Sequence, residues 1–177
     1  MGNLKVSTDR LDLIAGIAEI FRGDGNDREL LEKHLQAIVP ASWPPEHYEP
    51  HVLEFYANTL ADNPTAIGWT LWYMVLRKNA SGDPVVIGDI GFKGTPTPDG
   101  TVEIGYSVLS AFQRVGYATE AVAGLVAWAF SLPQVERVIA ETYPELVASV
   151  RVLENNGFRY IGPGSEDRVI RYELTRR

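Results

Sequence analysis

The residues best suited to chemistry lie in a short loop between two apolar stretches. Residues 102–108 read Val-Glu-Ile-Gly-Tyr-Ser-Val, and the loop Gln113-Arg-Val-Gly-Tyr-Ala-Thr119 precedes an alanine-rich apolar segment. A strand that passes through a glycine-containing loop into a helix is a recurrent phosphate-binding arrangement, because the loop N–H groups and the helix dipole point at the anion. Gly116 would let the backbone approach a phosphate closely. We therefore predict a phosphate-binding loop over residues 113–119; the alternative is a tight turn without a ligand.

The overall composition indicates one soluble globular domain over residues 1–177. Hydrophobic residues make up 45% of the chain and charged residues 22%, which is ordinary for such proteins. No apolar run is long enough to cross a membrane and the start lacks an apolar signal core, so we expect a cytoplasmic location. A net charge of −7 argues against a nucleic-acid or membrane partner and is compatible with a cationic or amine-bearing substrate.

The sequence also disfavours several other kinds of site. The chain has no cysteine, which excludes disulfides, thiolate metal sites and a cysteine nucleophile. His47 and His51 are four residues apart, but a proline lies between them and the order of residues is not that of a zinc-binding helix. We therefore expect no metal site.

The N-terminal part should contain one strand and two helices. Residues 8–14 alternate polar and apolar side chains, as a half-buried strand does. Asp27 can cap a helix over residues 28–39, and a second helix is expected from residue 49 or 50 to residue 60. The prolines between residues 40 and 46 must separate these helices, because proline cannot continue a helix.

The rest of the chain changes to a strand-rich pattern. An antiparallel meander is expected, with strands over residues 69–76, 84–92 and 101–109. A helix, a strand, a second helix and a hairpin should follow, over residues 118–132, 136–142, 144–155, and 158–162 with 169–174. A strand, a crossover helix and a strand make a parallel pair. The predicted fold is α/β, of the α+β kind: a mixed, mostly antiparallel sheet of six to seven strands, about four helices and one parallel strand pair.

Three motifs in this order resemble the GNAT N-acyltransferases, which transfer an acyl group from acyl-coenzyme A to an amine. The loop Gln113-x-x-Gly116-x-Ala118 is similar to the family's Q/R-x-x-G-x-G/A pyrophosphate motif, and Glu103-Ile-Gly-Tyr106 resembles the strand before it. Residues 148–158, Ala-Ser-Val-Arg-Val-Leu-Glu-Asn-Asn-Gly-Phe, are similar to a helix of the branch that acetylates the N-termini of ribosomal proteins. The order of elements extends the likeness over nearly the whole chain.

The resemblance implies an acyl-CoA cleft where the two parallel strands diverge. The pantetheine arm would lie there like an added strand, and a free N–H near Val108 would stabilise the developing oxyanion. Cofactor contacts are expected from Tyr106, Val108, Gln113, Arg114, Val115, Gly116, Tyr117, Ala118, Thr119 and Arg151.

The chemistry needs a base for the ammonium group of the acceptor and a proton donor for the departing thiolate. Glu103 is the expected base, with Glu141 as an alternative. Ser149 is the expected donor, and Tyr143 competes with it. Each of these residues also has a plain structural interpretation, as a solvated carboxylate, a small packing residue or a strand-end aromatic. Trp43 is expected in the core, or as a lining residue of the acceptor pocket.

Two positions depart from the family pattern. Leu146 stands where the related branch usually has an asparagine that helps to hold the cofactor, and Val115 stands where the loop often has a basic residue or glycine. Arg114 is then the only cation of the loop, so binding would depend mainly on backbone N–H groups.

We predict an N-acyltransferase, and specifically an acetyltransferase, that uses acetyl-CoA on a primary amine by direct attack in a ternary complex. The acceptor would be a small-molecule amine or a protein N-terminus. Two alternatives are a catalytically inactive acyl-CoA-binding sensor or scaffold and an interaction domain without a cofactor. Two copies could also pair as a homodimer, through residues 69–76 or the closing hairpin, but packing in the core of one chain explains these segments equally well.

Overall fold

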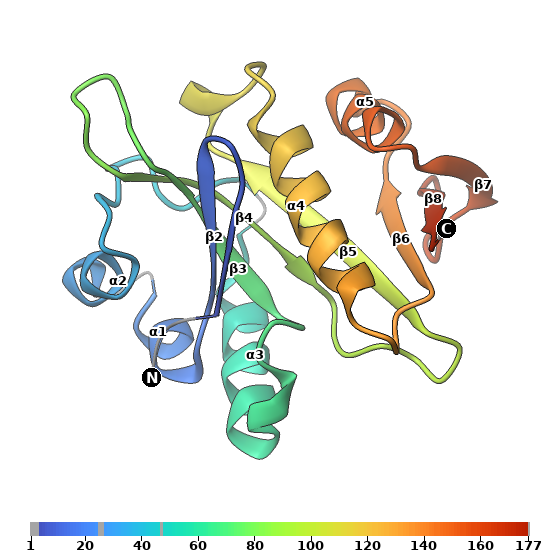
Figure 1. The fold of residues 1–177 in the computed structure, drawn as a ribbon, viewed down its shortest axis with the longest axis horizontal. Coiled ribbons are helices and arrows are strands. Elements are labelled where there is room, and N and C mark those ends of the chain that lie inside the picture. The colour runs from blue at the N-terminus through green and yellow to red at the C-terminus, as the bar shows by residue number, and fades with distance from the viewer. Residues whose placement is uncertain (1–3, 25–26, 47, 177) are drawn as a thin grey trace.

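An eight-stranded sheet runs through the protein, a computed structural model of which describes residues 4–24, 27–46 and 48–176. The strand order is β1-β2-β3-β4-β5-β6-β8-β7, and every neighbouring pair is antiparallel except β5 and β6 (Figure 1). The strands are β1 (Lys5–Ser7), β2 (Leu11–Ala15), β3 (Leu71–Leu76), β4 (Val85–Phe92), β5 (Thr101–Val108), β6 (Arg137–Thr142), β7 (Arg159–Pro163) and β8 (Ile170–Thr175).

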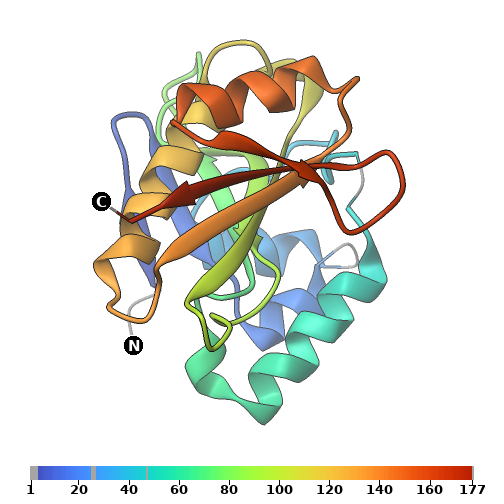
Figure 2. The ribbon, with the colours of Figure 1, turned by 90° about the vertical axis from the view of Figure 1, so that its right-hand side faces the viewer.

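Helices cover both faces of this sheet (Figure 2). The described helices are α1 (Ala18–Gly23), α2 (Arg28–Leu35), α3 (Pro50–Asp62), α4 (Tyr117–Ser131) and α5 (Val147–Asn155), with short 3-10 turns η1 (Pro64–Ala66) and η2 (Ser110–Phe112). One apolar core joins α4 and α5 to one face, and a second core joins α1, α2 and α3 to the other. The sheet is therefore the middle of three layers.

The apolar run at residues 71–76 forms the centre of the sheet. All six residues of β3 are buried, because β2 and β4 flank the strand and helices cover both faces. This position is closed to a second copy of the chain, so the predicted pairing of two copies through residues 69–76 is wrong. The edge strands are β1 and β7, and β7 exposes Tyr160 and Ile161.

The predicted fold class is confirmed, with two additions near the N-terminus. The single strand expected over residues 8–14 is a hairpin of β1 and β2, because Thr8 and Leu11 exchange hydrogen bonds that reverse the chain. The short helix α1 follows this hairpin, so the sheet has eight strands and the described chain five α-helices. None of the described helices is long and apolar enough to cross a membrane.

Two helix boundaries also differ from the prediction. The helix after Asp27 ends at Leu35, since Gln36 adopts a left-handed conformation with φ of 51°. Ile38 beyond it makes an isolated bridge to Val85 instead of packing from a helix. The last helix begins at Val147, three residues after the proline that was expected in its first turn.

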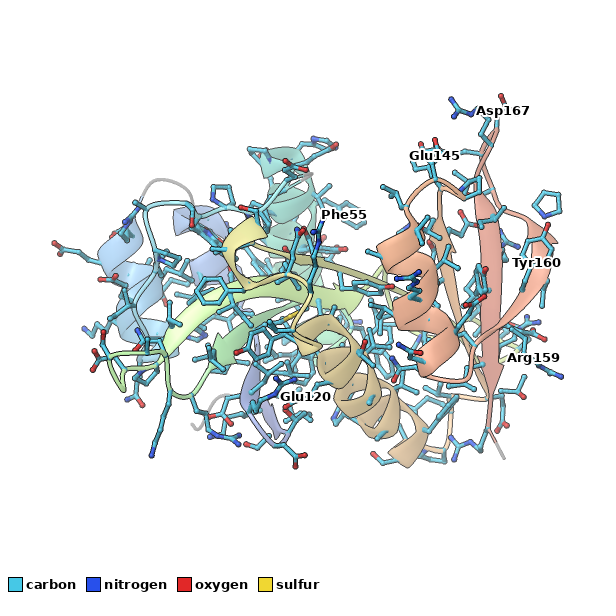
Figure 3. The ribbon with its side chains drawn as sticks, turned by 90° about the horizontal axis from the view of Figure 1, so that it is seen from above. Phe55, Glu120, Glu145, Arg159, Tyr160 and Asp167 are labelled. Atoms are coloured by element: carbon cyan, nitrogen blue, oxygen red, sulfur yellow. The ribbon has the colours of Figure 1, made fainter. Side chains whose placement is uncertain are left out.

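The hairpin of β1 and β2 is anchored to the start of α4 through Glu120. Its carboxylate accepts hydrogen bonds from Thr8 Oγ1 at 2.5 Å, from Arg10 N at 2.7 Å and from Arg10 Nε at 2.6 Å. Burial is the largest single influence and opposes ionisation, but these bonds and the Arg10 charge together lower the pKa of Glu120. Figure 3 shows Glu120 on the side of α4 that faces the hairpin. One carboxylate therefore connects the first and the central elements of the fold.

We expect Glu120→Gln to lower the free energy of unfolding by about 2 kcal/mol, because it removes the charge from three hydrogen bonds. Glu136→Gln is the matched control, since the exposed Glu136 carboxylate lies 3.8 Å from Arg176 and should change stability by less than about 0.5 kcal/mol. Urea denaturation of both variants measures the difference. Equal midpoints for the two variants would contradict this role of Glu120.

Candidate active site

The parallel strands β5 and β6 pair over only three residues. The pairs are Thr101 with Arg137, Val102 with Val138, and Glu103 with Ile139. Beyond Glu103 the other edge of β5 stays paired with β4 as far as Val108, and β6 stays paired with β8 as far as Thr142. The two strands therefore diverge along their last residues, as Figure 1 shows.

This divergence leaves backbone groups of β5 unpaired. Lys93 N donates to Glu103 O and Leu109 N donates to Ile87 O, so the odd-numbered residues of β5 bond to β4. In an antiparallel pair the alternate residues point their N–H and C=O groups away from the partner. The N–H groups of Tyr106 and Val108 thus face the side from which β6 has departed. An extended ligand can bind there as an added strand.

The loop after β5 has the geometry of an anion-binding site. Arg114 and Gly116 both adopt left-handed conformations, with φ of 65° and 88°, and such turns bring successive N–H groups to one side. Gly116 precedes α4 and no described side chain caps this helix. The first N–H groups of α4 therefore have no partner within the helix. Gln113 Nε2 donates to Val108 O at 2.8 Å and fixes the loop against β5.

A second cation lies beside this loop in addition to Arg114. Arg10 Nη1 donates to Val115 O at 3.0 Å, and the guanidinium lies 4.4 Å from the centre of the Tyr117 ring. A Cβ atom added to Gly116 would lie 3.4 Å from Arg10 Nη2. Sequence reasoning missed Arg10 because it is far from the loop in the chain, and only the sheet and Glu120 bring the two together.

The predicted proton donor Ser149 contacts a tyrosine of β5. Ser149 lies in the first turn of α5, and Tyr106 Oη is 3.1 Å from both its carbonyl oxygen and its Oγ. Burial raises the pKa of Tyr106 to about 12, which keeps the phenol protonated near neutral pH. Tyr143 is 41% exposed before α5, and its phenol makes no hydrogen bond to the described residues. Arg151 lies on the exposed surface of α5.

The two predicted bases, Glu103 and Glu141, both have cationic partners. The carboxylate of Glu103 accepts a hydrogen bond from Lys93 Nζ. Glu141 Oε1 lies 2.6 Å from Arg171 Nη2, and Ser165 donates to the same carboxylate from N and Oγ. Burial opposes ionisation, but the bonds from Ser165 and Arg171 lower the pKa of Glu141. This arrangement gives Glu141 a structural role between β6 and the closing hairpin.

A cavity of about 370 Å³ opens on the α3 side of β4 and β5. We call it the acceptor-side pocket. Its wall is aromatic and apolar and its rim is charged; the lining residues include Glu46, Tyr48, Glu49, Val52, Leu53, Tyr56, Asp89, Phe92, Lys93, Gly105 and Ser107. A larger cavity of about 710 Å³ lies between α1, α2 and the strands β2 and β3, away from the diverging strands. The smaller pocket is the one that adjoins β5.

Asp89 at this pocket is a partly buried acid that sequence reasoning missed. It lies on β4 between Tyr73 of β3 and Ser107 of β5 in the sheet register. Its Oδ2 is inaccessible to solvent and has no hydrogen-bond partner among the described residues. Burial and, to a lesser extent, the charge of Asp24 raise the pKa of Asp89 to about 7. A single aspartate inside an apolar strand carries no motif, so only the fold shows its position.

The pocket wall is held by a second buried acid, Asp24. Its carboxylate accepts hydrogen bonds from Tyr73 Oη at 2.6 Å, from Trp43 Nε1 at 3.1 Å and from Tyr48 Oη. These bonds fix the segment around Trp43 and Tyr48 against β3. Trp43 is not among the residues that line the pocket and instead packs behind it against Tyr48 and Tyr73.

Residues 19–159 match the family model described as Acetyltransferase (GNAT) domain. The chain belongs to the GNAT acetyltransferase family. It is accordingly an acyl-CoA-dependent acetyltransferase, and the resemblance found in the sequence motifs is confirmed. The N-acetyltransferase YjdG of Bacillus subtilis (strain 168), named as uncharacterized, is 29% identical over 126 residues, which cover 71% of this chain and 72% of that protein.

Solved structures share the GNAT fold over almost the whole chain. The ribosomal-protein-S5-alanine acetyltransferase of Vibrio fischeri has a TM-score of 0.67 at 17% identity, covering 98% of this chain and 97% of that chain. RimL, a ribosomal L7/L12 alpha-N-protein acetyltransferase solved in complex with coenzyme A, has a TM-score of 0.67 at 15% identity, covering 97% and 98%. These similarities confirm the mixed sheet with one parallel pair.

No group of His, Asp or Glu side chains among the described residues could hold a metal ion. His47, one of the two histidines considered from the sequence, lies outside the described residues.

The raised pKa of Asp89 makes stability depend on pH. The group holds its proton more tightly in the folded state, so stability falls as pH rises from about 4 through about 7. Asp89→Asn removes this loss, and we expect it to stabilise the protein by roughly 2–3 kcal/mol more at about pH 8.5 than at about pH 5.

Asp83→Asn, in the exposed turn before β4, is the matched control and should show no such pH-dependent gain. Urea denaturation of the three proteins at both pH values measures the effect. An Asp89→Asn variant that gains no stability at the higher pH would show that the native carboxylate is not destabilised by burial.

Proposed function

We propose that the protein transfers an acetyl group from acetyl-CoA to a primary amine by direct attack within a ternary complex. The observation that supports this most is the divergence of β5 and β6 after three residue pairs, next to an uncapped helix start. Membership of the GNAT family supports the reaction class. Neighbouring structures of the same fold have been solved with coenzyme A and with acetyl-CoA, which supports the cofactor.

The diphosphate of the cofactor would bind at residues 113–119. The N–H groups of the loop and of the first turn of α4 supply donors, and the helix dipole adds a favourable field. Arg114 and Arg10 supply positive charge at the loop, which compensates for the absence of a basic residue at Val115. Tyr117, Ala118 and Thr119 contribute as residues of the first helical turn, and Arg151 on α5 is a further candidate phosphate contact.

The pantetheine arm would continue along the free edge of β5. There the N–H groups of Tyr106 and Val108 can bond to its amides, as a neighbouring strand would. The N–H group of Val108 is the proposed donor to the oxygen of the thioester carbonyl, where negative charge develops during attack. This placement brings the sulfur toward the first turn of α5 and Ser149.

Ser149 is the proposed proton donor to the departing thiolate. Its hydroxyl lies 3.1 Å from the phenol of Tyr106, which stays protonated because of burial and can replace the proton that Ser149 gives up. Tyr143 lacks a comparable partner among the described residues, which makes it the weaker candidate. Glu103 would act from the other face of β5, where its negative charge attracts the ammonium group of the acceptor.

The glycine of the loop provides a test of the proposed diphosphate site. Gly116→Ala should weaken acetyl-CoA binding by about tenfold or more, because the added Cβ strains a backbone with φ of 88° and lies where the phosphate must approach. Gly82→Ala is the matched control, since Gly82 has a φ of 91° in a remote turn and its added Cβ would meet no atom within 4 Å.

Isothermal titration calorimetry with acetyl-CoA measures both affinities. Equal losses for the two variants would place the diphosphate elsewhere. The absence of any thermal stabilisation by saturating acetyl-CoA would favour an interaction domain without a cofactor.

Substitutions at Ser149 and Tyr143 distinguish the two candidate proton donors. Ser149→Ala should lower kcat by about 10- to 100-fold and leave the Kd for acetyl-CoA within about twofold, because it removes a proton donor and little binding surface. Tyr143→Phe should leave both quantities near the wild-type values. Release of free thiol with a panel of primary amines measures turnover. A larger loss for Tyr143→Phe would reverse the assignment, and binding without turnover on any amine would favour the inactive acyl-CoA-binding module.

A further inference from the structure

The acceptor-side pocket contains an acid whose environment suits a cationic ligand. Asp89 lines a cavity of about 370 Å³ and is partly buried, and its Oδ2, which is inaccessible to solvent, has no hydrogen-bond partner among the described residues. A buried polar atom without a partner is unusual in a folded protein and indicates that a ligand or another group completes it. Three donors satisfy the nearby Asp24, whereas no donor among the described residues reaches Oδ2 of Asp89.

The rest of the pocket favours a small ammonium ion. Tyr48 and Tyr56 present aromatic rings, which attract cations. Glu46 and Glu49 add negative charge at the rim, while the cation of Lys93 is paired with Glu103. The volume lies in the range of small-molecule sites.

Among the described residues, a glycine of β5 leaves space between Asp89 and the diverging strands. Asp89 lies opposite Ser107 in the register, and the adjacent odd-numbered residue of β5 on the same face is Gly105. Gly105 is exposed, and a Cβ atom added to it would meet no atom within 4 Å. Ser107 Oγ donates to Glu46 O at 3.2 Å and so does not occupy the carboxylate of Asp89.

We propose that Asp89 binds the ammonium group of a small aliphatic primary amine in the acceptor-side pocket and accepts its proton before attack. This assignment rests on the proposed acetyl transfer and names both the class of acceptor and the base. Glu103 is less suited to act as the base, since Lys93 already donates a hydrogen bond to its carboxylate.

The reaction balances with these groups. The carboxylate of Asp89 takes one proton from R–NH₃⁺, which leaves R–NH₂ with a free lone pair. The nitrogen then attacks the thioester carbon, the C–N bond forms and the C–S bond breaks. The amide nitrogen loses its second proton to solvent, the thiolate gains a proton through Ser149, and Asp89 releases its proton to water when the product leaves. The net change is R–NH₃⁺ plus acetyl-CoA to the acetylated amine, coenzyme A and one proton.

The pH dependence follows from all the groups that face Asp89. Burial and the charge of Asp24 at the end of α1 raise its pKa to about 7. Tyr73 of β3, Tyr48 of the loop and Tyr56 of α3 all have raised pKa values and stay neutral over the working range. The other charged residues among the described pocket lining are Glu46, Glu49 and Lys93, and Lys93 is paired with Glu103. Activity should therefore rise with pH as Asp89 ionises.

The test compares Asp89→Asn with wild type, using short aliphatic monoamines and diamines and, in parallel, peptides with free N-termini. The pH profile of kcat/KM for wild type should show an acidic limb, which a merely structural residue would not produce. Asp89→Asn should lower kcat/KM about 100-fold, abolish that limb and leave the Kd for acetyl-CoA unchanged. Glu103→Gln should keep the limb.

Gly105→Val is the second variant, because it fills the route for the amine without touching Asp89. It should lower kcat/KM for amines at least about tenfold and keep acetyl-CoA binding. An unchanged pH profile in Asp89→Asn, or acetylation of peptides with no turnover of small amines, overturns the assignment while acetyl transfer stands. Failure of acetyl-CoA to bind wild type would overturn the proposed function itself.

Discussion

The site depends on one constraint, which is that β5 keeps its partner on one edge and loses it on the other. Pairing with β4 continues as far as Val108, while pairing with β6 stops at Glu103. Backbone groups left in this way must find other partners, since an unpaired buried N–H group is costly. The sheet thereby supplies a line of donors whose position is fixed by the fold and not by flexible side chains. The helix start at Gly116 extends that line, because its own first N–H groups are also unpaired.

Successive side chains of β5 point to opposite faces of the sheet, so the two faces of the strand have different neighbours. Tyr106 points toward α5 and contacts Ser149, whereas Gly105 and Ser107 border the pocket on the α3 side. A cofactor and an acceptor can thus approach the same short segment from different sides. The small side chain at Gly105 keeps the acceptor face open, and a larger residue there would separate the two ligands.

Much of this arrangement could be predicted from the sequence, because it resides in local patterns. The loop around Gly116, the strand before it and the helix that carries Ser149 are each recognisable from contiguous residues. The residues that were missed are those whose role depends on distant partners. Arg10 reaches the loop only because Glu120 holds the β1–β2 hairpin against α4, and Asp89 is unusual only because of what surrounds it. The pairing of Glu103 with Lys93 likewise requires knowledge of the register.

On the α3 side of the sheet, Asp24 has a structural role and Asp89 has the proposed functional role. Asp24 has three donors and holds Trp43, Tyr48 and β3 together, so its charge is satisfied by the fold. Asp89 lies in the same region with an oxygen that no described group satisfies. The negative charge of Asp24 raises the pKa of Asp89 in addition to the effect of burial and so makes Asp89 a better proton acceptor. Under the proposed assignment, an ammonium ion in the acceptor-side pocket would neutralise the charge of Asp89, so a carboxylate that lowers the stability of the fold would serve to bind a cation.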